Sequence, residues 1–314
     1  MRHIIAERLL VATLLPATAL LDTGCETEGC LRGEEGCEVP SACQALAFTC
    51  ADPSVELSVM TAAAEGPGGL DAVGAAGDFL LRNSEVEVVI DALDHPSHFA
   101  PTGGGILDFA NRDRDDDDTN HIVQVVGALP SDAVKYLRVR TFEGEGFVAL
   151  QLEGHLVGDE RQRVYTRYEL RACEPGLRVR TEMINGSDDT VVWSNADGTF
   201  WGGRSMLVFT PSAGEGYLHP TFGLGTLNDV VRETPFVVGT SHSTSPSAVA
   251  SVPCNVESLT GFHSGQVSTA GTPRRIVAPS DYEVFERFLA VRPGAGAAPG
   301  VDVALEMRRQ LFAE

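Results

Sequence analysis

The chain has 314 residues, of which 43% are hydrophobic and 21% are charged, a composition typical of a globular protein with a substantial core. Acidic residues outnumber basic residues by 44 to 23, which gives a formal net charge of -21. This balance argues against nucleic acid as a partner, because phosphate recognition needs a basic surface, and against electrostatic docking on anionic lipid.

Residues 1–24 have the pattern of a secretory signal peptide. Arg2 and Arg8 precede an apolar stretch over residues 9–21, which is too short to span a bilayer. The stretch continues into Leu21-Asp22-Thr23-Gly24-Cys25, which resembles a bacterial lipobox except for Asp22. We therefore expect an exported protein anchored to the membrane only through a lipid on Cys25. The alternative is an ordinary cleaved signal, with Cys25 in a disulfide.

Seven cysteines predict a disulfide framework in an oxidising compartment. If Cys25 carries lipid, six remain as disulfide candidates: Cys30, Cys37, Cys43, Cys50, Cys173 and Cys254. The first four lie close together in a segment too short to build a core, so we expect disulfides among them to staple a lipid-anchored leader over residues 25–50. Three pairings are open. Cys173 and Cys254 then pair with each other or remain buried thiols. Zinc is the rival reading of the four-cysteine cluster, which lacks the C-x-x-C spacing of structural zinc sites.

Residues 51–77 are rich in alanine, glycine and proline and predict a linker. Residues 78–292 then show repeated alternation of apolar and polar residues, clearest in Arg163–Arg171 and Leu177–Ile184. This pattern predicts antiparallel strands, each with one apolar face, that stack as two sheets in an all-β sandwich. Residues 293–314 predict a short linker followed by a C-terminal helix.

The segment Val164–Gly203 resembles part of the galactose-mutarotase-like supersandwich. The matching pieces are Thr166, Tyr168 and Leu170 on one strand, Leu177, Val179 and Asn185 on the next, and Phe200-Trp201 in the loop that follows. The resemblance implies a large antiparallel β-sandwich. Sugar epimerases of that fold carry a histidine in this loop, whereas this chain has Asp197, so mutarotase activity is not expected.

The layout also resembles the N-terminal part of large myxobacterial surface lipoproteins. The matching stretches are Cys37–Cys50, Gly77–Asn83 and Gly103–Asp108. In those proteins a cysteine-rich leader and a β-sandwich precede carboxypeptidase-regulatory-like modules. This resemblance implies downstream domains, absent from this chain, as further partners.

Two acidic or histidine-containing loops are candidates for metal binding. Asp113, Asp115 and Asp117 have the D-x-D-x-D spacing of calcium loops, although Asp118 and Gln124 stand where an EF-hand needs glycine and glutamate. The alternative is a solvated acidic loop. In the second loop, His95 and His98 lie near Asp91 and Asp94, residue types that bind zinc or iron or transfer protons. The alternative there is an ordinary polar loop.

The loop Asp197–Arg204 combines an aromatic pair with a carboxylate and a guanidinium, the mixture that binds sugars. We therefore take Asp197, Phe200, Trp201, Arg204 and His95 as ligand-binding candidates; the alternative is that both rings belong to the core. We expect the protein to bind carbohydrate or another envelope component, without evident catalytic machinery and with no required cofactor apart from the calcium hypothesis. The alternatives are a metal-assisted carbohydrate lyase or hydrolase, and a structural module of a larger lipoprotein.

Overall fold

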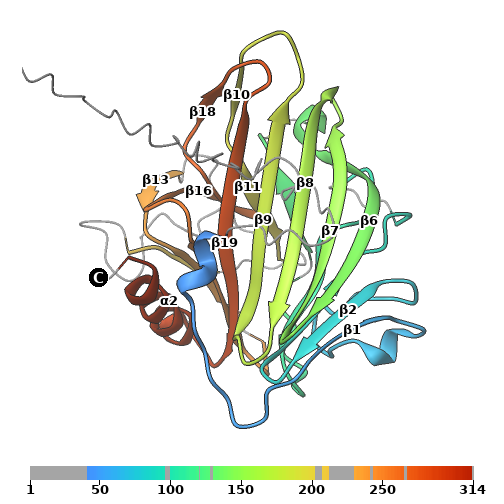
Figure 1. Ribbon diagram of the computed structural model, residues 1–314. Helices are drawn as coiled ribbons and strands as arrows, with labels where there is room; N and C mark the ends of the chain where they lie inside the picture. Colours follow the sequence, from blue (N-terminus) through green and yellow to red (C-terminus); the bar gives the residue numbers. More distant parts are fainter. Residues whose placement is uncertain are drawn as a thin grey trace, which may run out of the picture. The chain divides into compact units, whose positions relative to one another are not determined.

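Strands dominate the structure and form two large antiparallel sheets (Figure 1). The computed structural model describes residues 41–95, 100–119, 121–127, 130–201, 207–211, 230–240, 243–264 and 267–312. They lie in a unit that runs from Pro40 to Glu314. The predicted signal peptide and the predicted roles of Cys25, Cys30 and Cys37 lie outside the described residues.

One sheet contains nine strands, and its first four are consecutive hairpins. Asn83 ends the second strand, because its side-chain oxygen accepts hydrogen bonds from the backbone amides of Glu85 (2.8 Å) and Val86 (2.7 Å) and so closes the turn. In spatial order the strands are β1 (Val55–Val59), β2 (Phe79–Asn83), β3 (Val86–Ile90), β4 (Ile106–Asn111), β5 (His121–Val125), β11 (Ala196–Phe200), β17 (Val267–Gly271), β16 (Leu259–Ser264) and β13 (Val230–Thr234).

The other large sheet contains eight strands, including the longest of the described chain. In spatial order they are β12 (Leu207–Phe209), β14 (Val237–Thr240), β15 (Ser247–Pro253), β19 (Tyr282–Pro293), β9 (Gly176–Asn185), β8 (Asp159–Arg171), β7 (Phe147–Leu156) and β6 (Val134–Gly144). The strands predicted over Arg163–Arg171 and Leu177–Ile184 are therefore confirmed as parts of β8 and β9. A separate two-stranded ribbon pairs β10 (Val191–Trp193) with β18 (Arg275–Val277).

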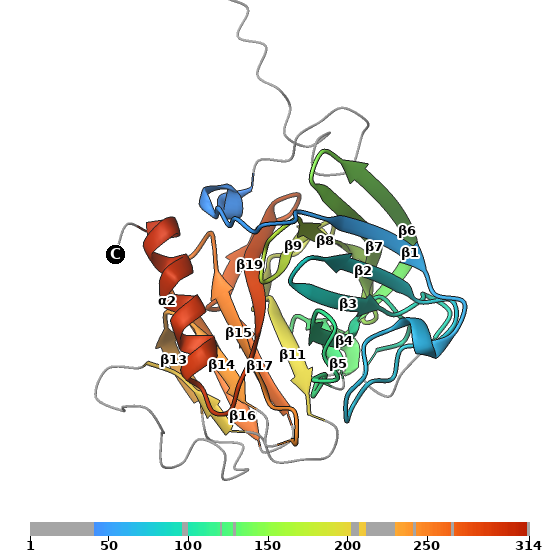
Figure 2. The same cartoon turned by 90° about the horizontal axis from the view of Figure 1, so that it is seen from below.

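The core lies between the two large sheets, as Figure 2 shows from below. Leu81 and Phe109 of the nine-stranded sheet and Leu150 and Tyr168 of the eight-stranded sheet are completely buried in one cluster. The predicted all-β sandwich is thus confirmed, because each sheet buries the apolar face that the period-two pattern marks.

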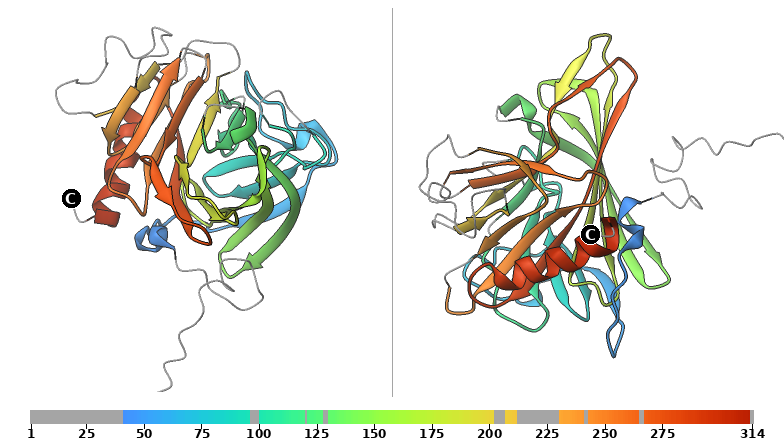
Figure 3. Two further views of the ribbon diagram at one scale, coloured as in Figure 1. Left: turned by 90° about the horizontal axis from the view of Figure 1, so that it is seen from above. Right: turned by 90° about the vertical axis from the view of Figure 1, so that its left-hand side faces the viewer.

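The C-terminal helix α2 (Ala298–Phe312) packs on the outside of the eight-stranded sheet (Figure 3). Val303, Ala304 and Met307 form one apolar stripe, which is buried against strands that include β15. Within the described residues, no helix has the length and hydrophobicity needed to cross a membrane.

Much of the segment predicted to be a linker belongs to the sandwich. Residues 55–59 form β1, which pairs with β2 in the nine-stranded sheet. Beyond β1, Met60 packs on the outer face of that sheet against Leu80 and Val89. The small residues that suggested a linker allow this stretch to lie close to the sheet; for example, the amides of Val73 and Gly74 donate to the Asp108 carboxylate.

Candidate functional site

Two disulfides join the cysteine-rich leader to the sandwich. Cys43 pairs with Cys254, and Cys50 pairs with Cys173. The Cα atoms of these pairs are 5.2 and 5.3 Å apart, although the partners are separated by 211 and 123 residues in sequence. The prediction that Cys43 and Cys50 pair within the leader and Cys173 with Cys254 is therefore wrong. The described end of the leader has too little core of its own and is stabilised on the larger domain instead.

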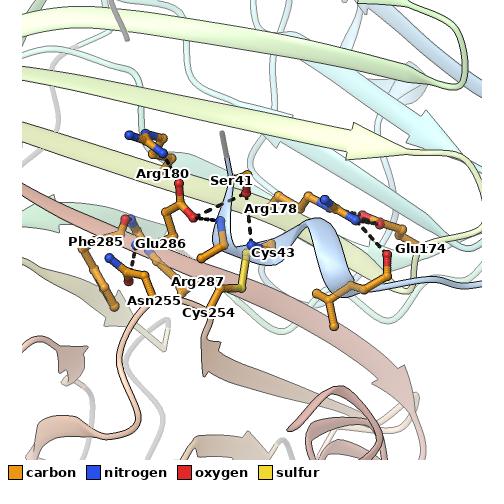
Figure 4. Close-up of a disulfide and its surroundings, with 12 residues drawn as sticks. Ser41, Cys43, Glu174, Arg178, Arg180, Cys254, Asn255, Phe285, Glu286 and Arg287 are labelled. Atoms are coloured by element: carbon orange, nitrogen blue, oxygen red, sulfur yellow. Dashed lines mark hydrogen bonds and ion pairs between the residues drawn. A yellow bond between two sulfur atoms is a disulfide. The ribbon is translucent and has the colours of Figure 1, made fainter. Parts of the chain in front are cut away.

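Buried ion pairs hold the same leader segment on the eight-stranded sheet (Figure 4). The Glu286 carboxylate accepts hydrogen bonds from the Ala42 backbone amide and the Ser41 hydroxyl, at the start of the short helix η1 (Ala42–Ala45). Arg180 pairs with the other oxygen of Glu286. Arg178, itself paired with Glu174, donates to the backbone oxygen of Leu46 at 3.2 Å. These contacts fix where the leader meets the domain.

The structure buries two of the predicted sugar-binding side chains, Asp197 and Trp201. Asp197 and Trp201 are only 2% and 3% exposed. The indole nitrogen of Trp201 donates to the Ser268 hydroxyl at 3.0 Å, so its polar atom is satisfied inside the protein. Phe200 is partly buried, and Arg204 lies outside the described residues. Asp197 and Trp201 are therefore core residues, and neither is available to stack on or hold a sugar.

Asp197 instead forms a buried charge pair that the sequence did not reveal. Arg287 of β19 is completely buried and donates from Nε to Asp197 at 2.9 Å and from Nη1 to the Thr181 hydroxyl at 2.8 Å. Gln124 of β5 also donates to Asp197, at 2.7 Å. The pair joins the two sheets, because Asp197 lies on β11 and Arg287 on β19.

The three aspartates of the D-x-D-x-D stretch lie in different environments. Asp117 is fully buried and accepts a hydrogen bond from the Phe109 amide at 2.8 Å. Asp113 and Asp115 are exposed. Asp116, between them and Asp117, accepts from both the amide and the side chain of Asn111. The loop thus points its later carboxylates into the structure, so the three predicted ligands do not converge on one ion.

The other predicted loop does bring ionisable groups together, in what we call the His95 centre (Asp78, Asp91 and His95). Strands β2 and β3 pair with Phe79 opposite Ile90, which places Asp78 and Asp91 side by side just beyond the paired ends. His95 Nδ1 lies 3.2 Å from an oxygen of each carboxylate. Both aspartates are buried, whereas the imidazole is 42% exposed.

Burial and crowding of like charges give the His95 centre unusual proton affinities. Burial, reinforced by the neighbouring charge of Asp78, raises the pKa of Asp91 to about 7. Burial alone would lower the pKa of His95, but the charges of Asp78 and Asp91 and the hydrogen bonds to them outweigh this effect and raise it. Nearby on β4, burial also raises the pKa of Asp108 to about 6. Such perturbed groups are typical of functional sites, although structural networks produce them too.

This arrangement suits two kinds of chemistry. The carboxylates orient the imidazole through Nδ1, and the other ring nitrogen, Nε2, lies 3.9 Å from the exposed Asp94 carboxylate. Such a nitrogen can exchange a proton with a ligand. Alternatively, one ligand atom from each of Asp78, Asp91 and His95 can hold a metal ion, since these atoms all lie within 4.8 Å of one another.

The sequence supplied two of the three members of the His95 centre. Asp91 and His95 stood out as neighbours in one loop, whereas Asp78 comes 13 residues before Asp91 and reaches it only through hairpin register. The only available signal for Asp78 was its position at the start of the predicted sandwich, residues 78–292. His98, the other histidine of the loop, lies outside the described residues.

No protein-family model matches the chain, and no curated protein does so either. Solved structures do match. The GH36 α-galactosidase AgaB from Geobacillus stearothermophilus is 9% identical with a TM-score of 0.52, over 74% of this chain and 42% of that chain. A galactose mutarotase-like protein from Clostridium acetobutylicum is 8% identical with a TM-score of 0.40, over 77% of this chain and 99% of that one. Another galactose mutarotase-like protein, from Lactobacillus casei, is 8% identical with a TM-score of 0.41, over 69% of this chain and 100% of that one.

Galactose mutarotase-like proteins are thus among the solved structures to which this β-sandwich is similar. The resemblance noted over Val164–Gly203 is therefore confirmed at the level of fold. This chain spans less than half of the α-galactosidase that it matches, 42% of its length. At such low identities the likeness concerns the fold alone, and the chemistry has to be argued from this chain's own residues.

Proposed function

We propose that this protein is an exported, lipid-anchored β-sandwich of the cell envelope that binds carbohydrate at the His95 centre. The observation that carries the proposal is the half-exposed His95 imidazole held by two buried carboxylates. Burying carboxylates costs free energy unless they are paired, so a centre of this kind at the ends of two strands is a candidate for binding.

The disulfides support export. Disulfides persist in oxidising compartments and are rare in the cytosol. Cys43–Cys254 and Cys50–Cys173 both link the leader to the domain, and the leader follows the predicted signal peptide and the lipid-acceptor cysteine Cys25. Metabolic labelling with a radioactive fatty acid tests the anchor: we expect label on the native chain and none on Cys25→Ser. An unlabelled native chain would remove the anchor from the proposal.

Two observations support carbohydrate as the ligand. The sandwich shares its fold with part of a protein whose name is GH36 α-galactosidase, so a fold of this kind occurs in a carbohydrate-active enzyme. Sugar hydroxyls both donate and accept hydrogen bonds. The His95 imidazole and the exposed Asp94 carboxylate, 3.9 Å from it, can form charge-assisted hydrogen bonds with them.

The metal-assisted carbohydrate-active enzyme remains a second candidate, and one specific observation favours it. The three possible ligand atoms of Asp78, Asp91 and His95 lie close enough together to hold one ion. One nitrogen and two carboxylate oxygens suit zinc or iron. Such an ion would supply Lewis acidity, while Asp78, also bound by the amides of Ala75 and Ala92, would stay fixed in place.

One experiment separates these functions. The full chain is purified in detergent and screened on a glycan array, and its metal content is measured. We expect the native protein to bind at least one glycan and His95→Gln to bind it at least about tenfold more weakly, the loss of one charge-assisted hydrogen bond. Asp302→Asn, an exposed aspartate on α2, is the matched control and should bind as the native protein does.

The alternative outcomes have distinct meanings. Stoichiometric zinc or iron in the native protein, lost in Asp91→Asn but not in Asp302→Asn, would favour the enzyme. A native protein that binds neither glycan nor metal would overturn both functions and leave a structural module. Unchanged glycan binding by His95→Gln would show that the glycan binds elsewhere on the protein.

A further inference from the structure

Basic side chains gather on the outer face of strands β6, β7 and β8, although the chain as a whole is strongly acidic. Residues such as Leu150 and Val164 point into the core, so their neighbours along each strand point outward. The register of the three strands then sets six basic side chains against two acidic ones on this face: Lys135, Arg138, Arg140, Arg163, Arg167 and Arg171, with Glu153 and Glu169. We call these eight residues the arginine face.

The ion pairs on the arginine face leave it with surplus positive charge. Glu153 is shared by Arg138 (3.5 Å) and Arg140 (3.3 Å). Glu169 is likewise shared by Arg167 (2.9 Å) and Arg171 (2.7 Å). Each carboxylate therefore neutralises one of its two guanidinium groups. Arg163 is exposed and has no ion-pair partner among the residues that the structure describes.

The arginine face combines accessible side chains with side chains that aromatic rings hold in place. The side chains of Arg138, Arg140 and Arg171 are 72%, 48% and 40% exposed. The guanidinium of Arg167 lies 5.2 Å from the ring centre of Phe142, and that of Arg171 lies 5.8 Å from the ring centre of Phe147. Guanidinium groups already held in place lose less conformational entropy when they bind an anion.

The leader meets the domain directly beside this face. Arg180, which pairs with Glu286 at the start of η1, stands opposite Arg167 in the register of β8 and β9. Figure 1 looks onto this side of the eight-stranded sheet, with η1 in front of β19. The helix η1, in the described part of the leader, therefore lies on the same side of the sheet as the arginine face.

We infer that the arginine face docks on the anionic phospholipid headgroups of the membrane that holds the lipid anchor. Arginine is suited to phosphate because its planar guanidinium donates two parallel hydrogen bonds. The net charge of -21 does not prevent this contact. Charges more than about 8–10 Å away are screened at physiological salt, so a headgroup at the arginine face is influenced mainly by the local surplus. The inference rests on the proposed anchor for its setting, because the anchor brings the face to the membrane.

The test uses residues 25–314, the chain left after cleavage of the predicted signal peptide, with Cys25→Ser, so neither a lipid nor the apolar stretch 9–21 contributes to docking. The protein is sedimented with phosphatidylcholine vesicles that contain or lack phosphatidylglycerol. We expect binding only to the vesicles with phosphatidylglycerol, and its loss at about 1 M salt, where the screening length falls to about 3 Å. Arg140→Gln and Arg163→Gln should each weaken binding about fivefold, the effect expected for one basic residue near an anionic surface.

A matched control removes the same charge elsewhere. Arg309→Gln changes an exposed arginine on α2, outside the arginine face, and should bind vesicles as the parent protein does. Equal binding to both vesicle types would overturn the inference, and so would equal losses in Arg309→Gln and Arg140→Gln. Binding to a soluble acidic polysaccharide but not to vesicles would also overturn it and would assign the face to an acidic glycan. Because this assay needs no lipid on Cys25, its failure is distinguishable from failure of the proposed anchor.

Discussion

The guanidinium of Arg287 and the carboxylate of Asp197 form an ion pair in the interior between the two sheets, where Arg287 has no exposed surface. Each partner comes from a different sheet, and the Arg287 side chain also lies over the ring of Phe285, 4.6 Å from its centre. A buried ion pair is costly to desolvate, so its two members depend strongly on each other.

Removing one member of this pair should therefore destabilise the fold severely. We expect Arg287→Met to lower the free energy of unfolding by about 3–5 kcal/mol, because it leaves the Asp197 charge buried without its partner. The double variant Arg287→Met with Asp197→Leu should lose less unfolding free energy than Arg287→Met alone. Urea unfolding at neutral pH measures these two variants and the single variant Asp197→Leu. A double variant whose loss equals the sum of the two single losses would show that the residues do not interact.

The Asp197–Arg287 pair also shows where prediction from the sequence succeeded and failed. The period-two pattern fixes which face of each strand is apolar, so β8, β9 and the sandwich were predictable. Asp197 was conspicuous beside two aromatic residues, but its partner is 90 residues further along the chain. A carboxylate next to a tryptophan looks the same in a sequence whether it faces a ligand or a buried arginine.

The cysteines illustrate the same difficulty over longer range. Close spacing favoured pairing within the leader, since short loops close easily. The observed pairs close loops of 211 and 123 residues, because the leader segment lies across strands that come from distant parts of the chain. By contrast, two of the three members of the His95 centre were predictable, because Asp91 and His95 are neighbours in one turn.

The observed cysteine pairing gives a second prediction. Peptide mapping without reduction should find Cys43 linked to Cys254 and Cys50 linked to Cys173. Replacing both Cys43 and Cys254 by serine should lower the free energy of unfolding by about 2–5 kcal/mol, since a long closed loop is released in the unfolded chain. Urea unfolding without a reducing agent measures this loss. A peptide that joins Cys43 to Cys50 would contradict the structure.

A third prediction concerns acid sensitivity through His121 of β5. Burial lowers the pKa of His121 to about 4 from an ordinary value of 6.5. The unfolded chain therefore binds this proton more tightly than the folded chain. The contribution of the neutral imidazole is fully present above pH 6.5 and is lost as the pH falls toward 4.

The His121→Leu variant isolates this contribution. We expect the difference in unfolding free energy between the native protein and His121→Leu to shift in favour of the variant as the pH falls between 6.5 and 4. Comparison with the native protein is needed because the raised pKa of Asp108 makes the fold more stable, not less, as the pH falls. The native fold loses stability as the pH rises and the buried Asp108 ionises, whereas Asp108→Asn does not. The difference in unfolding free energy should therefore shift in favour of Asp108→Asn as the pH rises through about 6. A pH-independent difference for His121→Leu would show that the imidazole titrates normally.

The last prediction tests whether Trp201 belongs to the core or to a sugar site. The chain has two tryptophans, and both are buried: Trp193 is 4% exposed and Trp201 is 3% exposed. We expect blue-shifted fluorescence that acrylamide quenches poorly and that sugars leave unchanged.

Gly239 lies directly against the Trp201 ring, so a Cβ there would come within 2.4 Å of the indole. Gly239→Ala should therefore destabilise the fold by about 1–3 kcal/mol, the usual cost of overpacking a core, and alter the tryptophan emission. Strong quenching by acrylamide, or an emission change with a sugar that Trp201→Phe abolishes, would return this ring to the ligand-binding candidates.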